Sequence, residues 1–207
     1  MTNTAPTRKR RKDDRPGEII TAAFREFDEK GFGRSTMAGI AERAGISRTT
    51  IYLYYDTKEA IFEAAIRGSV EVTIDIVAGM AKDANGDFRT VFARAIDLIY
   101  ARLVSDEGGV ILKTLVAEGS AMPDLILFYR QEILSKGEAA IRALIERGII
   151  NGELSVACRG DDVRVFVAPA IFAALWLRIF HKIDPLDINA FKEAHVRLVT
   201  DGLLARP

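Results

Sequence analysis

Cysteine and histidine are scarce in this chain, whose 207 residues include one cysteine and two histidines. A single cysteine excludes an internal disulfide. Cys158 lies in the loop-like segment NGELSVACRGDD with only Arg159 beside it to lower its pKa, so we expect a passive thiol, with redox sensing as the alternative. His181 and His195 are too far apart in sequence for a local metal pair. No metal site and no cofactor are therefore predicted.

Catalytic motifs and long apolar runs are also missing. The sequence has no Gly-rich phosphate loop, no nucleophile elbow and no pair of catalytic carboxylates, so we do not expect an enzyme. No stretch approaches the run of about 18 apolar residues that crosses a membrane. No apolar segment follows the early basic residues, as a secretory signal would require. These absences predict a cytoplasmic protein with no membrane partner.

The chain has no net charge, but its positive and negative residues are unevenly distributed. Residues 1–60 hold 12 Lys and Arg against 9 Asp and Glu, whereas residues 61–207 hold 17 against 20. Most of the positive excess lies in one run, Arg8, Lys9, Arg10, Arg11 and Lys12. We expect residues 1–14 to form a disordered basic arm that follows a DNA backbone or minor groove, with a solvated tail as the alternative.

Strand signals are almost absent, while apolar residues recur at helical spacing along the chain. The pattern predicts an all-α fold with a domain over residues 15–60 and a larger helical domain over residues 61–207. Pro169 falls inside a helix predicted from residue 161 or 162 to about 182, which it should bend. The other predicted helices cover about residues 15–30, 57–80, 87–104, 110–118 and 123–147, with a last one starting at 187.

The segment from Thr36 to Lys58 has the pattern of two short helices joined by a tight turn. Gly45 suits the left-handed backbone that ends the first helix, because it has no Cβ to clash. Ser47 can cap the free N–H groups of the second helix. One apolar stripe can bury on the first helix, formed by Met37, Ile40, Ala41 and Ala44. This pattern favours a helix-turn-helix, and a helical hairpin with a merely solvated polar face is the alternative.

Residues 19–62, IITAAFREFDEKGFGRSTMAGIAERAGISRTTIYLYYDTKEAIF, resemble the amino-terminal domain of the TetR/AcrR family of bacterial transcriptional regulators. The ending PLDINAFKEAHVRLVTDGLL is similar to the last helix of many members. Ala38 and Gly39 depart from the usual Arg-Asp pair, which puts base contacts from the first short helix in doubt, and Tyr55 replaces the common Phe. The resemblance implies that a DNA duplex is contacted by Thr36, Ser47, Arg48, Thr49, Thr50, Tyr52, Tyr54 and Lys58. Thr36, Tyr54 and Lys58 would hold phosphates, and Arg48, Thr49, Thr50 and Tyr52 would lie nearest the bases.

The resemblance also implies a pocket for a small effector in the carboxyl-terminal helices. Candidate lining residues are Phe92, Ile96, Tyr100, Leu103, Leu115, Glu118, Phe128 and Trp176. For each apolar member plain core packing is an equal alternative, and Glu118 can equally be a solvated carboxylate. The effector itself is not identified by the sequence.

The last two helices carry more apolar surface than one small bundle needs, which favours a homodimer. Its interface is predicted at Phe166, Ala170, Ala173, Ala174, Leu177, Phe180, Phe191 and Leu198, with internal core as the alternative for the alanines. Two copies related by a dyad would read a near-palindromic operator with half-sites about 34–36 Å apart, or a multiple of that.

These patterns together predict a dimeric DNA-binding transcriptional regulator, a repressor released from its operator by an apolar or amphipathic ligand. One rival is a regulator of the same architecture that acts as an activator or is controlled by a protein partner. The other is a helical small-molecule enzyme or carrier with a vestigial DNA motif.

Overall fold

The computed structural model describes residues 14–82 and 86–203, which form α-, 3-10 and π-helical segments and no β-strand. The predicted all-α fold is confirmed. The basic arm predicted over residues 1–14 lies, apart from its last residue, outside the described residues. None of the described helices combines the length and the apolar character needed to cross a membrane.

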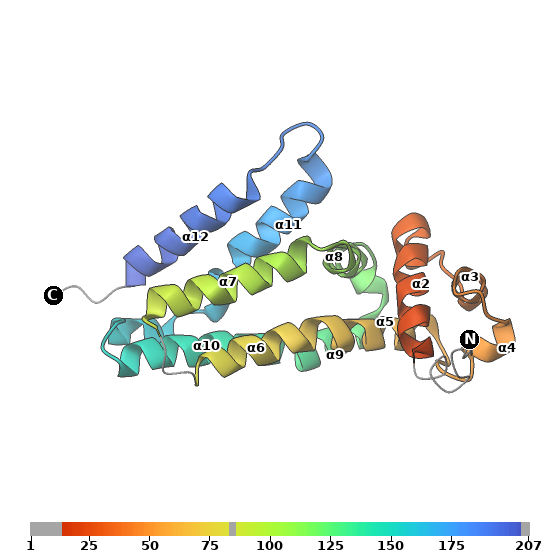
Figure 1. Cartoon of the computed structure of the whole chain (residues 1–207), viewed down its shortest axis with the longest axis horizontal. Helices are drawn as coiled ribbons and strands as arrows, with labels where there is room; N and C mark the ends of the chain where they lie inside the picture. The colour runs from red at the N-terminus through yellow and green to blue at the C-terminus, as the bar shows by residue number, and fades with distance from the viewer. Residues whose placement is uncertain (1–13, 83–85, 204–207) are drawn as a thin grey trace, which may run out of the picture.

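Four short helices form the amino-terminal part, at the right of Figure 1: α2 (Arg15–Lys30), α3 (Met37–Arg43), α4 (Arg48–Ile51) and α5 (Lys58–Ile66). Their apolar faces meet in one core, because each helix carries buried residues on a single side. Three phenylalanines pack edge to face or tilted at its centre, with ring centroids 4.9–5.8 Å apart: Phe27, Phe32 and Phe62.

Local capping sets the starts of three of these helices, and the cap at Ser47 is the predicted one. The side chains of Thr36, Ser47 and Thr57 each accept a hydrogen bond from the backbone N–H three residues ahead, at 3.0–3.1 Å. Gly31 and Gly45 have φ of 77° and 64°, the left-handed conformation that favours glycine. These turns fix the angles at which α3 and α4 leave their neighbours.

The rest of the chain forms an elongated helical bundle (Figure 1). Two long rods run through π-helical turns: α5 continues as η1 (Arg67–Glu71) and α6 (Val72–Met80), and α9 (Pro123–Phe128) continues as η3 (Tyr129–Leu134) and α10 (Ser135–Ile150). The other segments are α7 (Phe88–Val104), α8 (Asp106–Glu118), η2 (Gly119–Ala121), η4 (Val156–Gly160), η5 (Val163–Phe166), α11 (Ala168–Phe180) and α12 (Ile188–Leu203).

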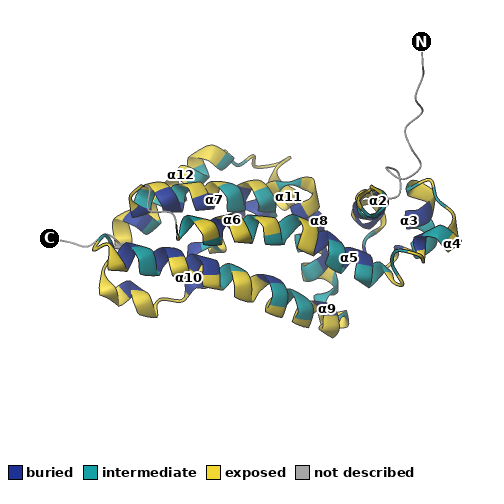
Figure 2. Cartoon of the chain, turned by 60° about the horizontal axis from the view of Figure 1, so that its bottom comes forward, coloured by how far each residue is buried: buried dark blue, intermediate teal, exposed yellow. Residues whose placement is uncertain are grey.

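The bundle has its own core around α7, α10 and α11 (Figure 2). His195 of α12 lies inside it, and its Nδ1 is 3.1 Å from the hydroxyl oxygen of Tyr100. Burial lowers the pKa of His195, which the backbone of Phe166 partly opposes. Cys158 is also buried, and burial raises the pKa of its thiol.

Two helix predictions are wrong in detail. The helix predicted from residue 161 or 162 to about 182 is instead the 3-10 turn η5 followed by α11, so Pro169 stands in the first turn of a helix and bends none. The helix predicted from Val110 begins earlier, at Asp106, because Ser105 caps it.

The alanine stripe of α11 faces inward, which contradicts part of the predicted dimer interface. Phe166, Ala170, Ala173 and Ala174 are at most 3% exposed in the single chain, and α11 packs against α7. Small side chains here permit close approach within one chain, so these four residues cannot contact a second copy. Leu177 and Phe191 are partly buried, while Phe180 and Leu198 are exposed.

Candidate nucleic-acid interface and internal cavity

The second short helix is held from one side and exposed on the other. Ile51 of α4 is buried against Ile40 and Ala41 of α3, and the turn between them closes with Ile46 N–H donating to the carbonyl of Ala41 at 3.0 Å. Because one face is fixed, the opposite face is presented to solvent at the end of the molecule farthest from α12 (Figure 1).

Three of the side chains predicted to contact bases are exposed to solvent. Arg48 and Thr49 are exposed, and Tyr52 is 53% exposed. They provide a guanidinium, a hydroxyl and a phenol on one short helical turn, and these groups suit base edges and phosphates in a major groove.

The remaining predicted DNA contacts already have structural roles. Thr36 and Ser47 cap helices, and the Thr50 hydroxyl is 2.7 Å from that of Ser47. A hydroxyl can still accept a further hydrogen bond while it caps a helix, so DNA contact by these residues stays a prediction. Tyr54 is partly buried against the amino-terminal core.

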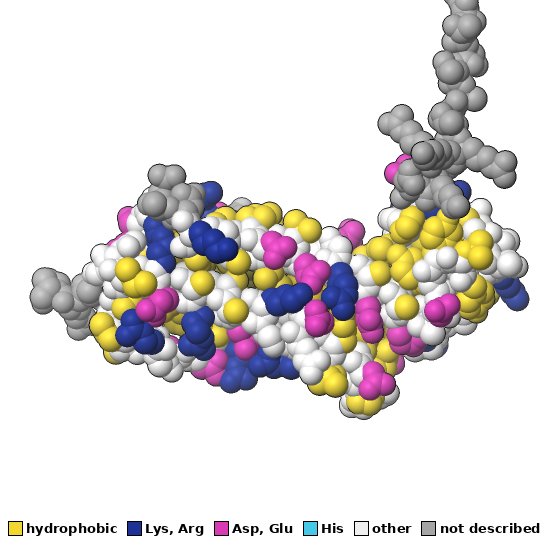
Figure 3. All heavy atoms as spheres, turned by 90° about the horizontal axis from the view of Figure 1, so that it is seen from below, with side chains coloured by type: hydrophobic (Ala, Val, Ile, Leu, Met, Phe, Trp, Pro, Cys, Tyr) yellow, Lys and Arg dark blue, Asp and Glu magenta, His cyan; other side chains and the backbone are white. Residues whose placement is uncertain are grey.

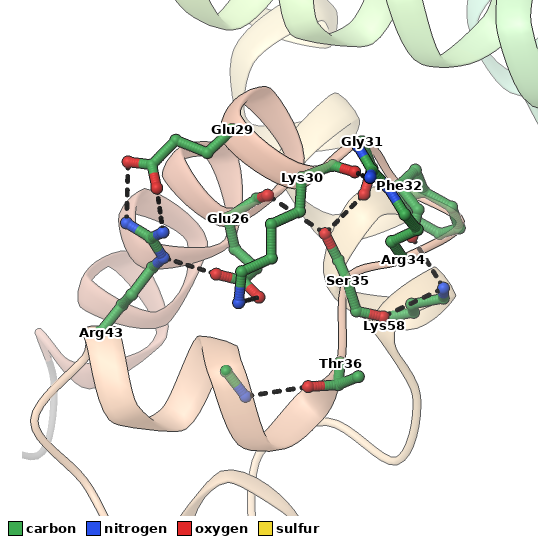
Figure 4. A network of polar contacts seen from close by, with 11 residues as sticks. Glu26, Glu29, Lys30, Gly31, Phe32, Arg34, Ser35, Thr36, Arg43 and Lys58 are labelled. Atoms are coloured by element: carbon green, nitrogen blue, oxygen red, sulfur yellow. Dashed lines mark hydrogen bonds and ion pairs between the residues drawn. The ribbon is translucent and has the colours of Figure 1, made fainter.

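Lys58, predicted as a direct phosphate ligand, has hydrogen-bond partners within the chain in this structure. Its ammonium donates to the carbonyls of Phe32, Gly33 and Ser35 at 2.8, 3.1 and 3.2 Å, and lies 4.6 Å from the centre of the Phe32 ring. An ammonium has three donors, and all three are used. In this structure Lys58 ties the loop between α2 and α3 to α5 (Figure 4).

A buried carboxylate, absent from the predicted site, positions the first short helix (Figure 4). Glu26 of α2 is 1% exposed and pairs with Lys30 at 2.7 Å and with Arg43 of α3 at 2.5 Å. Burial raises the pKa of Glu26, but hydrogen bonds from Lys30 and Arg43 outweigh it and leave the pKa below its ordinary value. Arg43 also forms a two-pronged pair with Glu29.

Gly39 explains one departure from the family pattern. A Cβ at this position would overlap the carboxylate of Glu26, whose own position is fixed by Lys30 and Arg43. The glycine and the buried acid therefore form a matched pair across the contact between α2 and α3.

Comparison with known sequences bears on this domain directly. The sequence model described as bacterial regulatory proteins, tetR family, matches residues 19–65, which span α2 to α5. The amino-terminal domain of this chain is thus similar to the DNA-binding domain of the TetR family. HTH-type transcriptional regulators are its relatives: YdeS of Bacillus subtilis is 25% identical over 89% of this chain and 92% of its own length. YfiR of the same organism is 36% identical over 41% of this chain and 39% of its own length.

Solved TetR-type structures share the whole fold. A TetR-family regulator from Mesorhizobium loti superposes with a TM-score of 0.73, 18% identity and coverage of 97% of this chain and 100% of that one. The regulator FadR from Bacillus subtilis, in complex with stearoyl-CoA, gives a TM-score of 0.74 at 21% identity over 90% of this chain and 98% of that one.

The carboxyl-terminal bundle contains an apolar cavity of about 340 Å³. It lies between the rod α5–η1–α6, helix α7, the rod η3–α10 and the segment from η5 to α11. Residues of the first rod that line it are Val70, Thr73, Ile74 and Val77. Across the described residues no group of three or more His, Cys, Asp and Glu is arranged to hold a metal ion.

Of the eight predicted lining residues, only Leu103 borders this cavity. Phe92, Ile96 and Tyr100 are buried in the bundle core, because they lie on the inner face of α7. Leu115 and Phe128 pack against the amino-terminal core instead. Glu118 accepts a hydrogen bond from Gly33 N–H at 2.9 Å, and Trp176 donates its indole N–H to the carbonyl of Asp184 at 3.0 Å. Apolar spacing alone could not separate these positions from the residues that line this cavity.

Proposed function

We propose that this protein is a dimeric transcriptional regulator that binds duplex operator DNA through α3 and α4 and leaves it when a small molecule fills the bundle cavity. The observation that carries DNA binding is the presentation of Arg48, Thr49 and Tyr52 on a helix pinned by Ile51. A fixed helix with an exposed polar face can enter a major groove without a further ordering cost.

The exposed apolar surface of α11 and α12 supports dimerisation. Phe172, Ile179, Phe180 and Leu198 are 50%, 62%, 39% and 75% exposed, and Ile183 in the connecting loop is 83% exposed. Contiguous apolar surface of this kind marks an interaction site. A second copy paired here would form a four-helix interface and bring two reading helices to one duplex.

The cavity is connected to the reading domain by continuous helix and by polar contacts. The rod that lines it with Val70 and Ile74 begins with α5, whose Ile61 and Phe62 lie in the amino-terminal core. Helix α8 adds a second connection: Lys113 donates to the carbonyl of Asp28 at 2.9 Å, and Glu118 binds Gly33. An effector that favours a different position of this rod by about 1–3 kcal/mol would weaken operator binding 5- to 150-fold.

Relatives support release by a small molecule. The stearoyl-CoA complex of FadR and a choline complex of a regulator from Saccharomonospora viridis show ligands in the same fold. SmeT of Stenotrophomonas maltophilia is described as the repressor of a multidrug efflux pump. Activation is the second candidate, because the activator FasR of Mycolicibacterium smegmatis is 26% identical over 47% of this chain.

Selection of bound fragments from randomised duplex tests the proposal. The wild type should enrich a near-palindrome, and a metabolite mixture should reduce recovery of that sequence. Arg48→Ala and Tyr52→Ala should change the enriched sequence, because base contacts specify and phosphate contacts only position. An unchanged preference in both variants would contradict the assignment of α4 as the reading helix.

A further inference from the structure

The wall of the cavity contains one buried cation with unused donors. Arg102 of α7 has a side chain only 15% exposed and borders the cavity. Its Nη1 donates to Glu107 at 3.0 Å, while its Nε and Nη2 are buried and have no hydrogen-bond partner. Unmet donors on a buried charge are costly, so this arrangement favours an additional acceptor.

The unused edge of Arg102 has a specific shape. Nε and Nη2 are parallel donors on one side of the planar guanidinium, and this edge matches the two oxygens of a carboxylate. Glu107 binds only Nη1, on the opposite side of the guanidinium, so the edge formed by Nε and Nη2 stays open.

Other polar groups on the wall do not compete for that edge. Glu138 accepts from Arg130, and Arg164 is 73% exposed and paired with Asp162. Tyr129 makes no hydrogen bond from its hydroxyl to any described residue, burial raises its pKa, and the nearby charge of Arg102 opposes that rise. Tyr129 can therefore add a neutral hydroxyl donor beside the cation.

Apart from Thr73, the remaining lining is apolar and includes Ile74, Ile99, Leu103, Ile133, Ile141 and Ile171. A volume of about 340 Å³ lies near the lower end of the range of about 300–1,000 Å³ for small-molecule sites. The cavity thus suits a slender hydrocarbon body with one polar end.

We infer that the effector is an aliphatic monocarboxylate, whose carboxylate pairs with the Nε and Nη2 edge of Arg102 while its chain fills the cavity. This inference rests on the proposed function, whose effector it specifies. It also places the polar end of the ligand at α7, next to the Ser105 turn that starts α8.

Calorimetry on the full-length protein without DNA tests the ligand class. Octanoate, decanoate and dodecanoate are titrated beside decanol and decylamine. Decanoate should bind more tightly than decanol or decylamine. Arg102→Met should weaken decanoate by about 10- to 150-fold and leave decanol unchanged or tighter, because only the charged hydrogen bonds are lost. Arg102→Lys keeps the charge but loses the paired Nε and Nη2 donors, so its decanoate affinity should lie between those of the wild type and Arg102→Met.

Two further variants keep the test independent of folding. Arg164→Met is the matched control, since it removes another arginine from the same wall and should leave decanoate affinity unchanged. Gly137→Leu should block all these ligands, because a Cβ at Gly137 meets nothing closer than 3.9 Å and a longer side chain would occupy the cavity. Circular dichroism confirms that each variant is folded.

The outcomes separate the inference from the proposed function. Equal decanoate binding in the wild type and Arg102→Met, a preference for decanol or decylamine, or no binding of any of the three carboxylates would overturn the carboxylate assignment. Binding through Arg102 with no effect on affinity for the selected operator would support it and contradict ligand-induced release.

Discussion

At the scale of single residues, the amino-terminal domain depends on polar groups that hold backbone in place. Glu26 is buried at the contact between α2 and α3. Lys58 donates hydrogen bonds to three carbonyls of the loop between these helices. Neither role is visible in the sequence, because each depends on partners many positions away. The caps Thr36, Ser47 and Thr57 were predictable, since their partners lie three residues ahead.

Gly39→Ala should lower the free energy of unfolding by about 1–3 kcal/mol, because the added methyl group overlaps the fixed carboxylate of Glu26. Chemical denaturation followed by circular dichroism measures this. The matched control is Gly68→Ala, where a Cβ meets nothing within 4 Å. That control should be neutral or stabilising by about 0.5–1 kcal/mol. Equal effects of the two substitutions would show that Gly39 is not needed for the contact.

Lys58→Met should lower the free energy of unfolding by about 1–3 kcal/mol, because three loop carbonyls lose their donor. The slope of log affinity for DNA against log salt should stay unchanged. Arg48→Met should behave in the opposite way, changing the preferred operator sequence with no loss of stability, because it removes a base contact. A reduced slope in Lys58→Met would restore its role as a direct phosphate ligand.

At the scale of helices, the sequence predicts well which segments are helical. It predicts poorly which neighbour each helix face packs against. The rod from Thr57 to Met80 and the helix from Asp87 to Val104 are where periodicity puts them. The alanines of α11 are the counterexample, because a small-residue stripe suits close packing against any helix. Only the fold shows that the partner is α7 of the same chain. The cavity lining could not be predicted for the same reason.

The docking of α12 should depend on pH through His195. Because burial lowers its pKa below the ordinary value near 6.5, the unfolded chain binds a proton before the folded one does as pH falls. The contribution of His195 to the free energy of unfolding is constant well above pH 6.5. As the pH falls below 6.5, that free energy declines by at most about 1.4 kcal/mol per pH unit.

Urea denaturation between pH 7.5 and 5.5 measures this decline, in a window above the titration of the carboxylates near pH 4. His195→Gln, which keeps a partner for Tyr100 but does not titrate, should show a smaller decline. His181→Gln, at an exposed position, should follow the wild type. If the free energy of unfolding declined equally with falling pH in all three proteins, His195 would not be the source of the decline.

At the scale of the whole molecule, the proposed dimer depends on the exposed face of α11 and α12. Leu198→Arg should raise the dimer dissociation constant more than about tenfold, a cost above about 1.4 kcal/mol, because a charge would be buried against apolar surface. Sedimentation equilibrium measures it. Ile150→Arg on α10, at a similarly exposed position, should leave the dimer intact.

Charge distribution distinguishes this apolar face from the rest of the bundle. On the face seen in Figure 3, Lys and Arg side chains alternate with Asp and Glu. Lys136 pairs with Glu71 and Glu132 at 2.6 and 3.2 Å, joining η1 to the rod of η3 and α10. Balanced charge of this kind suits solvent rather than DNA, in keeping with the proposal that the amino-terminal end binds the duplex.

Hydroxyl-radical footprinting on the selected operator tests most directly whether two copies of α4 read one duplex. The account predicts two protected patches related by a dyad, with centres about 34–36 Å apart or a multiple of that. Addition of the effector should remove both patches together. A single patch, or protection that persists unchanged in a variant lacking both Arg48 and Tyr52, would contradict it.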